Sequence, residues 1–209
     1  MGKLILIRHG HTSLNIPGQE ERLRGWLDVP LSNQGLKEAK ETARIVATFS
    51  VRTIYSSDLT RAIQTSEIIS RVVKAPVTPT PELRPWNLGV FAGQLIHQLL
   101  PFLHLLNKQP NAVAPGGESW NQFYERYSKR LVTLMKLAHE SKDNIAAVAH
   151  VRNFLTAPTI VLGGDKSRVP VKGGPKTGSV YIIEKVGRTW RIKTDKLELV
   201  TLAKLQANN

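Results

Sequence analysis

Short apolar runs alternate with longer amphipathic stretches along most of this chain. The runs at 4–7, 51–55 and 144–149 are rich in branched or small apolar residues, and each predicts a buried strand. Stretches with apolar residues at helical spacing begin after Ser32 and after Ser119, and Ser32 is well placed as an N-cap. This alternation of strands and helices predicts an α/β fold, a three-layer α/β/α sandwich with a largely parallel central sheet.

Polar residues predict where several helices begin. Ser119 and Gln122 form a capping-box pair before a helix that runs to about residue 141. Ser57 or Asp58 can cap a helix that follows the second strand, which puts Arg61 in its first turn. A cation at the positive end of a helix does not favour the helix itself. We therefore expect Arg61 to face an anion, for which the free N–H groups of the helix start are further donors.

The remaining segments fit into one domain. A chain of 209 residues can bury a hydrophobic core that needs no disulfide or metal to stabilise it. Because we find no repeat or linker, we expect a single domain over residues 1–209. Alternating patterns at 179–184 and 189–194 predict a hairpin. The Gly/Pro/Lys-rich stretch at 163–178 predicts a loop, and it lacks the Gly before Lys that a nucleotide-binding loop requires.

The first strand ends in a cluster of polar residues, namely Arg8, His9, Thr12 and Asn15 around Gly10. Open α/β sheets bind their ligands at this end of their strands. An imidazole can attack phosphorus while a neighbouring guanidinium, always charged and forked, holds the phosphate oxygens. Thr12 and Asn15 add neutral donors for an oxyanion, and Gly10 lets the backbone pass close to a ligand. The cluster predicts phosphoryl chemistry.

Two further segments extend this pattern. Residues 56–65 read S-S-D-L-T-R-A-I-Q-T, and the strand at 144–149 is followed directly by His150. Together with R-H-G-x-T-x-x-N at 8–15, they resemble the histidine phosphatase superfamily, the phosphoglycerate mutase-like proteins. The resemblance covers roughly residues 3–184. It implies a phosphoglycerate mutase-like fold, a phosphohistidine intermediate and no cofactor.

The resemblance also implies roles for individual residues. His9 matches the nucleophile. The residues that match the phosphoryl-binding groups of the catalytic set are Arg8, Arg61 and His150. The residues that we expect to bind the substrate are Asn15, Thr12 and Arg22. Arg22 lies where relatives carry a basic residue, three positions before Gly25, which begins a G-W-x-D-x-P-L-S run at 25–32 that also resembles the superfamily. A partly apolar insert at about 94–115 corresponds to the cap over the active site, and it carries no pattern that identifies the substrate.

The general acid is where the chain departs from the family pattern. Relatives carry L-x-E before a G-x-W/F-x-G segment, and the Glu protonates the leaving oxygen. Here that position is Pro85, which cannot donate a proton. Glu82 is the nearest carboxylate that could take the role. A leaving group of low pKa needs little protonation in any case.

Composition narrows the choice of partners. The chain has no Cys, and its 29 Lys+Arg against 16 Asp+Glu give a formal net charge of +13. A basic surface attracts small phosphorylated substrates and nucleic acid, and the scarcity of aromatic residues makes nucleic acid the less favoured partner. We find no metal-binding motif, no targeting segment and no apolar span near the roughly 20 residues of a membrane helix. We therefore expect a cytoplasmic protein that binds neither metal nor membrane.

The expected function is hydrolysis of a small phosphomonoester, and two alternatives stay open. The first is a phosphoglycerate mutase-type phosphotransferase. Mutases of this superfamily tend to be longer and to keep the acid that Pro85 replaces, which favours the phosphatase. The second is a degenerate member that binds a phosphorylated ligand or nucleic acid without turnover. Pro85, Val151 in place of the usual Gly, and the high charge favour it, whereas the intact His9 and His150 oppose it.

Overall fold

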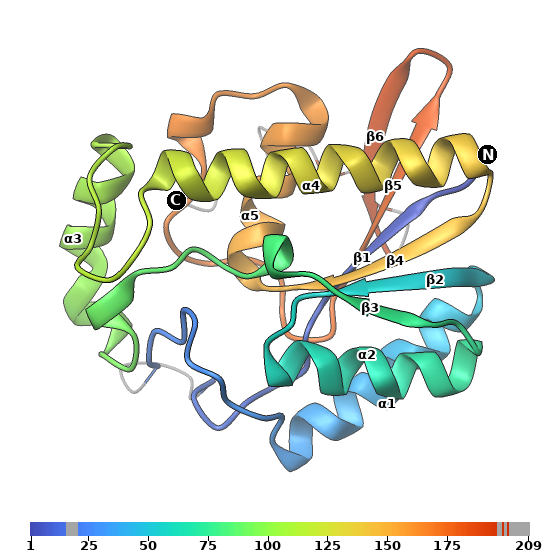
Figure 1. The fold of residues 1–209 in the computed structure, drawn as a ribbon, viewed down its shortest axis with the longest axis horizontal. Helices are drawn as coiled ribbons and strands as arrows, with labels where there is room; N and C mark the ends of the chain where they lie inside the picture. The colour runs from blue at the N-terminus through green and yellow to red at the C-terminus, as the bar shows by residue number, and fades with distance from the viewer. Residues whose placement is uncertain (16–20, 196–197, 199, 201–209) are drawn as a thin grey trace.

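A six-stranded sheet lies between two layers of helices in the computed structural model, which describes residues 1–15, 21–195, 198 and 200 (Figure 1). The strands are β1 (Leu4–Arg8), β2 (Val51–Ser56), β3 (Val77–Pro79), β4 (Asn144–Ala149), β5 (Val180–Val186) and β6 (Thr189–Thr194). The helices are α1 (Asn33–Ala47), α2 (Thr60–Val73), α3 (Ile96–Lys108), α4 (Trp120–Ser141) and α5 (Val151–Leu162). Among the described residues, short 3₁₀ segments lie at Pro81–Leu83, Gly89–Phe91 and Lys166–Arg168.

The strand order is β3-β2-β4-β1-β5-β6. The first four strands in that order are parallel, and β5 and β6 add the predicted hairpin as an antiparallel edge. Helices α1 and α2 cover one face of the sheet, and α4 and α5 cover the other (Figure 1). The three-layer α/β prediction with a largely parallel sheet is confirmed.

Strand β1 shows how the sequence builds both layers. Leu4 and Leu6 pack into the core shared with α4 and α5, whereas Ile5 and Ile7 pack into the core shared with α1 and α2. All four side chains are fully buried. Because successive side chains of a strand point to opposite faces, a strand covered on both sides needs an apolar residue at every position.

Parallel pairing brings three strand ends together. Arg8 pairs with Ala149 across β1 and β4, and Ser56 pairs with Val148 across β2 and β4. The next residues along the chain are therefore neighbours at one edge of the sheet, although they are far apart in sequence. The functional residues predicted after each strand meet at this edge.

The predicted cap of α2 is wrong. The N-cap residue is Leu59, and its side chain makes no capping bond. The cap comes instead from a distant loop, because Asp28 accepts bonds from the N–H and the hydroxyl of Thr60, each at 2.7 Å. Ser57 and Asp58 have other partners, described below. The predicted caps Ser32 and Ser119, the latter with its capping box, are confirmed.

Two further segments close the region beyond the strand ends. Helix α3 occupies most of the expected cap insert and carries Ile96 and Leu103. The loop at 163–178 runs back from α5 to β5, and Gly174 (φ +103°) lies so close to α5 that a Cβ there would stand 2.7 Å from a methyl of Val151. In the described part of the chain, no helix is long and apolar enough to cross a membrane.

Candidate active site

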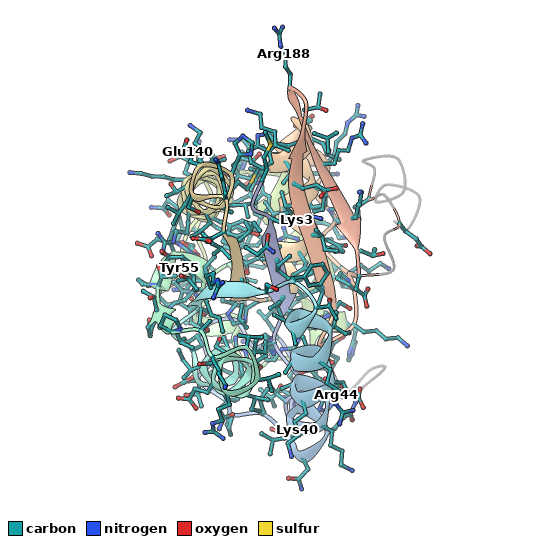
Figure 2. The ribbon with its side chains drawn as sticks, turned by 90° about the vertical axis from the view of Figure 1, so that its right-hand side faces the viewer. Lys3, Lys40, Arg44, Tyr55, Glu140 and Arg188 are labelled. Atoms are coloured by element: carbon teal, nitrogen blue, oxygen red, sulfur yellow. The ribbon has the colours of Figure 1, made fainter. Side chains whose placement is uncertain are left out.

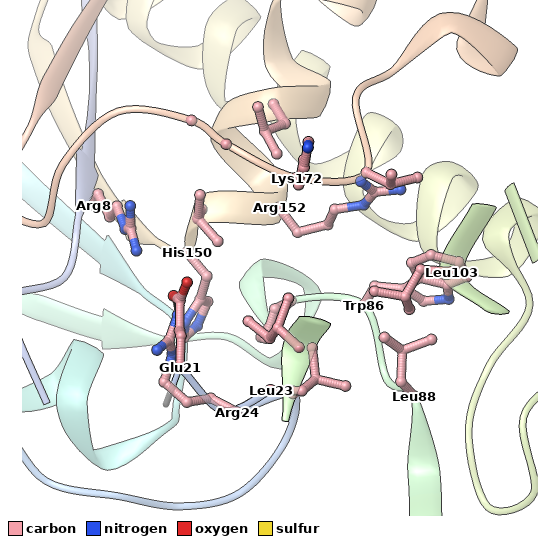
Figure 3. A pocket seen from close by; sticks show the side chains of 18 of the residues that line it. Arg8, Glu21, Leu23, Arg24, Trp86, Leu88, Leu103, His150, Arg152 and Lys172 are labelled. Atoms are coloured by element: carbon pink, nitrogen blue, oxygen red, sulfur yellow. Dashed lines mark hydrogen bonds and ion pairs between the residues drawn. The ribbon is translucent and has the colours of Figure 1, made fainter. Parts of the chain in front are cut away.

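A cavity of about 390 Å³ lies beyond the carboxyl ends of β1, β2 and β4 (Figure 3). The charged and titratable residues that line the cavity come from distant parts of the chain. The histidines and arginines among them are Arg8, His9, Arg24, Arg61, His150 and Arg152. The sequence-predicted set of Arg8, His9, Arg61 and His150 is therefore assembled at one place.

The two histidines follow neighbouring strands and face each other. Their ring centroids are 5.0 Å apart in an edge-to-face arrangement. Nδ1 of His9 lies 2.7 Å from the carbonyl oxygen of Gly10. A carbonyl only accepts, so Nδ1 carries the hydrogen and Nε2 keeps its lone pair. Nε2 of His150 lies 2.8 Å from the hydroxyl of Ser57, and its Nδ1 has no partner among the described residues.

Both imidazoles are held in the neutral form. Burial lowers the pKa of His9 well below its usual value, and the charges of Arg61 and Arg8 lower it further. Burial also lowers the pKa of His150 well below its usual value, and Arg61 again adds to the effect. A neutral imidazole with a free Nε2 is the form that can act as a nucleophile at neutral pH.

Three arginines surround the histidines, and most of their hydrogen bonds within the described chain go to backbone carbonyls. Arg61 donates to the carbonyls of Leu27 at 2.7 Å and Gly25 at 2.9 Å. Arg8 donates to the carbonyl of Pro175. Arg24 donates to a carbonyl of the first loop at 3.1 Å, and its contact with the Glu21 carboxylate is long, at 3.5 Å.

The cations of the cavity are poorly neutralised. Burial, followed by repulsion from Arg24, lowers the pKa of Arg8 to about 10 and that of Arg61 to about 9. Glu21 is the only carboxylate among the described residues that line the cavity. Several guanidinium groups in a small, partly desolvated space favour a ligand with more than one negative charge.

The loop that carries His9 is fixed by close backbone packing. A Cβ on Gly10 would lie 2.5 Å from the carbonyl oxygen of Gly35 in α1, and a Cβ on Gly35 would lie 2.0 Å from that of His11. The N–H of Gly10 also donates to the hydroxyl of Thr65 in α2 at 3.2 Å. The sequence predicted that Gly10 lets the backbone pass close to a ligand. In the structure the close neighbour of Gly10 is instead the backbone of α1, and this packing requires the glycine.

Three predicted substrate-binding residues do not line the cavity. Asn15 accepts bonds from the N–H and the hydroxyl of Thr12 at 2.9 and 3.0 Å, so this pair shapes the first loop. Arg22 is exposed and donates to the carbonyl of Gly93 at 2.9 Å. The basic residue that reaches the cavity from this segment is Arg24, two positions later.

The general-acid role expected for Glu82 does not fit the structure. Glu82 is exposed, does not line the cavity and accepts a bond from the hydroxyl of Thr80. That bond lowers the pKa of Glu82, which is opposite to what a proton donor needs. Pro85 does line the cavity, so the position that carries the acid in relatives is in place without a carboxylate.

Four cavity residues escaped the sequence reasoning. Arg24 and Glu21 lie beside the motif residue Gly25, and Lys172 and Lys176 lie in the loop dismissed as a nucleotide site. The signal for Arg24 was its distance of one residue from the G-W segment. The signal for Lys172 and Lys176 was the high content of Lys and Gly in the loop at 163–178. No group of three or more potential metal ligands occurs in the described parts of the chain.

Comparison with known proteins agrees with this geometry. The chain is 31% identical over 203 residues to the probable phosphoglycerate mutase GpmB of Proteus mirabilis, covering 90% of this chain and 93% of that protein. The solved structure of Bacillus stearothermophilus YhfR matches with a TM-score of 0.77 at 26% identity, over 92% of this chain and 95% of that one.

A mycobacterial glucosyl-3-phosphoglycerate phosphatase also matches with a TM-score of 0.77, at 23% identity over 92% of this chain and 97% of that one, which shows the shared fold. The family model described as the histidine phosphatase superfamily (branch 1) matches residues 4–196. Family, fold and assembled residues agree, so the chain belongs to branch 1 of the histidine phosphatase superfamily.

Proposed function

We propose that this protein is a phosphomonoester hydrolase that acts through a phosphohistidine intermediate. The observation that carries the proposal is the state of His9, a buried neutral imidazole whose Nδ1 donates to Gly10 and whose ring lines a cavity rich in arginine. This orientation leaves the lone pair of Nε2 available for in-line attack on phosphorus.

The reaction runs in two displacements. Nε2 of His9 forms a bond to phosphorus while the bond from phosphorus to the ester oxygen breaks, and the alcohol leaves with a proton. Water then attacks the phosphohistidine, the bond from phosphorus to Nε2 breaks, and inorganic phosphate leaves. The carbonyl of Gly10 keeps the ring oriented in both steps, because its bond to Nδ1 is compatible with the neutral and the phosphorylated ring.

Arg8, Arg61 and His150 stabilise the transferring phosphoryl group. Removing one preorganised donor from such a site typically costs about 10²–10³ in rate. The unpartnered Nδ1 of His150 is suited to donate if Nε2 accepts the hydrogen of the Ser57 hydroxyl, 2.8 Å away. Ser57 therefore sets the tautomer of His150 in this proposal.

Glu21 protonates the leaving oxygen in this proposal. It is the only carboxylate among the described cavity residues, and Figure 3 shows its side chain pointing into the cavity. Pro85 leaves the usual acid position without a proton donor. The weak contact of Glu21 with Arg24, at 3.5 Å, is one that a bound phosphate can replace.

The relative named a probable phosphoglycerate mutase supports an alternative, phosphoryl transfer between two hydroxyls of one substrate. A mutase must protonate one oxygen and deprotonate another in the same cavity, and Pro85 weakens that chemistry. Interconversion of isotopically labelled phosphoglycerates by the native chain would favour the mutase over the hydrolase.

The first test is phosphate release from p-nitrophenyl phosphate and from sugar and nucleotide monophosphates. We expect turnover by the native chain, none by His9→Ala, and native-like rates from His104→Ala, which removes an exposed histidine of α3. Rapid quenching with radiolabelled substrate should trap an acid-labile phosphoprotein in the native chain and in His104→Ala, but not in His9→Ala. Absence of turnover on every ester would overturn the proposal and favour a non-catalytic phospholigand-binding protein.

A further inference from the structure

The cavity extends beyond the phosphoryl site to a second basic end. Arg152, at the start of α5, and Lys172, in the loop before β5, line this end (Figure 3). Figure 3 shows both on the side toward Trp86 and Leu103, with His150 between them and Arg8. A cavity of this size belongs to the range that holds small organic ligands rather than a phosphate ion alone.

Arg152 is a buried cation without an anionic partner. It is 8% exposed, and burial lowers its pKa to about 9. One Nη donates to the carbonyl of Pro170, the other lies 3.4 Å from the amide oxygen of Asn107, and Nε has no partner among the described residues. No carboxylate in the described parts of the chain forms an ion pair with it.

Two indole rings fix the position of this cation. The guanidinium carbon lies 4.3 Å from the ring centroid of Trp120 and 5.1 Å from that of Trp86. Aromatic faces and a carbonyl orient a guanidinium and stabilise it partly, but they leave its net charge in place. A buried charge of this kind is favourable when a ligand of opposite charge completes it.

The loop beside α5 places a second cation at the same end. The close approach of Gly174 to Val151 and Leu155 holds this loop against the first turns of α5, and Lys172 lies two residues earlier. Lys172 is exposed and has no carboxylate partner among the described ion pairs. The cavity walls also include apolar side chains, those of Leu23, Trp86, Leu88, Leu103 and Leu155.

We propose that Arg152 and Lys172 form a second anion site, and that the substrate is a phosphomonoester that carries another anionic group beyond a short apolar segment. The inference rests on the proposed function, because it uses the same cavity and names the class of its substrate. The phosphoryl group binds at His9, the apolar segment lies along the leucines, and the second anion contacts the two cations.

The test compares matched pairs of substrates. Each ω-carboxyalkyl phosphate, with three to six methylene groups, is paired with its methyl ester, and kcat/KM is measured for both. We expect the native chain to prefer the acid by roughly ten- to a hundredfold at the best length, the range of a charge-assisted hydrogen bond. A second series with a terminal phosphate shows which anion is preferred, and a preference for either anion supports the site.

Three variants locate the effect. Arg152→Met should bring the acid-to-ester ratio close to one, whereas Arg152→Lys should keep part of it. Lys172→Ala, an exposed change that does not threaten folding, should lower the ratio severalfold. Lys40→Ala removes the same charge from the exposed face of α1 (Figure 2) and should leave the ratio as in the native chain. An equal loss on acid and ester in Arg152→Met, with no effect of Lys172→Ala, would assign Arg152 to packing alone and overturn the site.

Failure of this inference can be told from failure of the proposed function. A chain that hydrolyses p-nitrophenyl phosphate but shows equal kcat/KM for acids and esters lacks the second anion site and is still a hydrolase. If no ester is hydrolysed, calorimetric binding of the matching phosphonates, with and without the carboxylate, decides the anion site alone. Tighter binding of the carboxylated phosphonate that depends on Arg152 supports the site, and equal binding overturns it.

Discussion

At the level of single residues, backbone carbonyls hold the cations of the cavity where carboxylates would be expected. Arg8, Arg61 and Arg152 each donate to carbonyl oxygens and make no ion pair within the described chain. A carbonyl orients a guanidinium without cancelling its charge. The site is therefore built to meet a multiply charged anion, and its free energy of binding comes from charges that the fold leaves unpaired.

Glu21 provides the sharpest test among single residues. Glu21→Gln should lower kcat/KM for an alkyl phosphate by about 10², the lower range for loss of a general acid. It should affect p-nitrophenyl phosphate much less, because nitrophenolate leaves without a proton. The measurement is the ratio of kcat/KM for the two esters, in the native chain and in the variant.

Glu82→Gln is the matched control, since Glu82 is an exposed carboxylate outside the cavity. Its ratio should equal that of the native chain. A similar loss on both esters in Glu21→Gln would assign Glu21 to binding through Arg24 and leave leaving-group protonation to water.

The neutral histidines make stability depend on pH. Burial and the nearby arginines hold the pKa values of His9 and His150 well below the usual value, so the folded chain does not take up protons that the unfolded chain binds near pH 6.5. The free energy of unfolding should therefore be highest above about pH 6.5 and fall as the pH drops toward the lowered pKa values. The slope approaches about 1.4 kcal/mol per pH unit for each histidine.

Urea unfolding at pH 7.5 and at pH 5 measures this slope. The double variant His9→Gln/His150→Gln should lose clearly less stability between the two pH values than the native chain, while the other histidines contribute equally to both. An identical pH dependence would mean that the two imidazoles take up protons in the folded protein as they do in the unfolded chain, so that their pKa values are not lowered.

Single-sequence reasoning found the residues that lie in compact motifs and missed those defined by the fold. Arg8, His9, Arg61 and His150 follow strand ends, where position in the sheet and chemistry agree. The sequence does not reveal the role of Arg24, because a hydrogen bond to a backbone carbonyl of the first loop holds this side chain in place. Every residue has a backbone carbonyl, so no residue type marks such a contact in the sequence. Glu82 was chosen for its nearness along the chain to Pro85, but its carboxylate turns to Thr80 and solvent.

At the level of elements, the start of α2 links folding to the site. Arg61 is the second residue of this helix, and Asp28 caps the helix through Thr60. The predicted caps failed because both have distant partners that no local pattern reveals. Ser57 bonds to His150, and Asp58 makes a two-point ion pair with Arg84 at 2.6 and 2.7 Å.

Asp28→Ala should reduce stability and activity together. Loss of a helix cap typically costs about 1 kcal/mol, and fraying of the first turn moves the Arg61 guanidinium away from the phosphoryl site. We expect a lower unfolding midpoint and a fall in kcat on p-nitrophenyl phosphate. Asp143→Ala, an exposed change between α4 and β4, should alter neither quantity. A native-like kcat in Asp28→Ala would show that Arg61 is held by Gly25 and Leu27 alone.

At the level of the whole molecule, the charge of +13 acts on how substrates reach the cavity. Basic residues lie in several parts of the molecule, as the labelled Lys3 before β1, Lys40 and Arg44 on α1, and Arg188 between β5 and β6 show in Figure 2. Such a field attracts small anions over distances up to the Debye length. Raising the salt concentration from about 0.01 to 0.1 M shortens that length from about 30 to about 10 Å.

We therefore expect kcat/KM for a phosphomonoester to fall over this salt range while kcat changes little, because the buried cavity is screened less than the surface. The variant Lys40→Glu/Arg44→Glu, altered on the exposed face of α1, should show a weaker salt dependence at unchanged kcat. A salt dependence equal to that of the native chain would place the attraction in the cavity arginines. Nucleic-acid binding would give a different result, since each phosphate contact with a single strand changes the slope of log K against log salt by about −0.7. A steep slope for a single-stranded oligonucleotide, with competition against the phosphomonoester, would favour the nucleic-acid alternative. The shallow slope of a ligand with two to four charges is the outcome that a small phosphorylated substrate predicts.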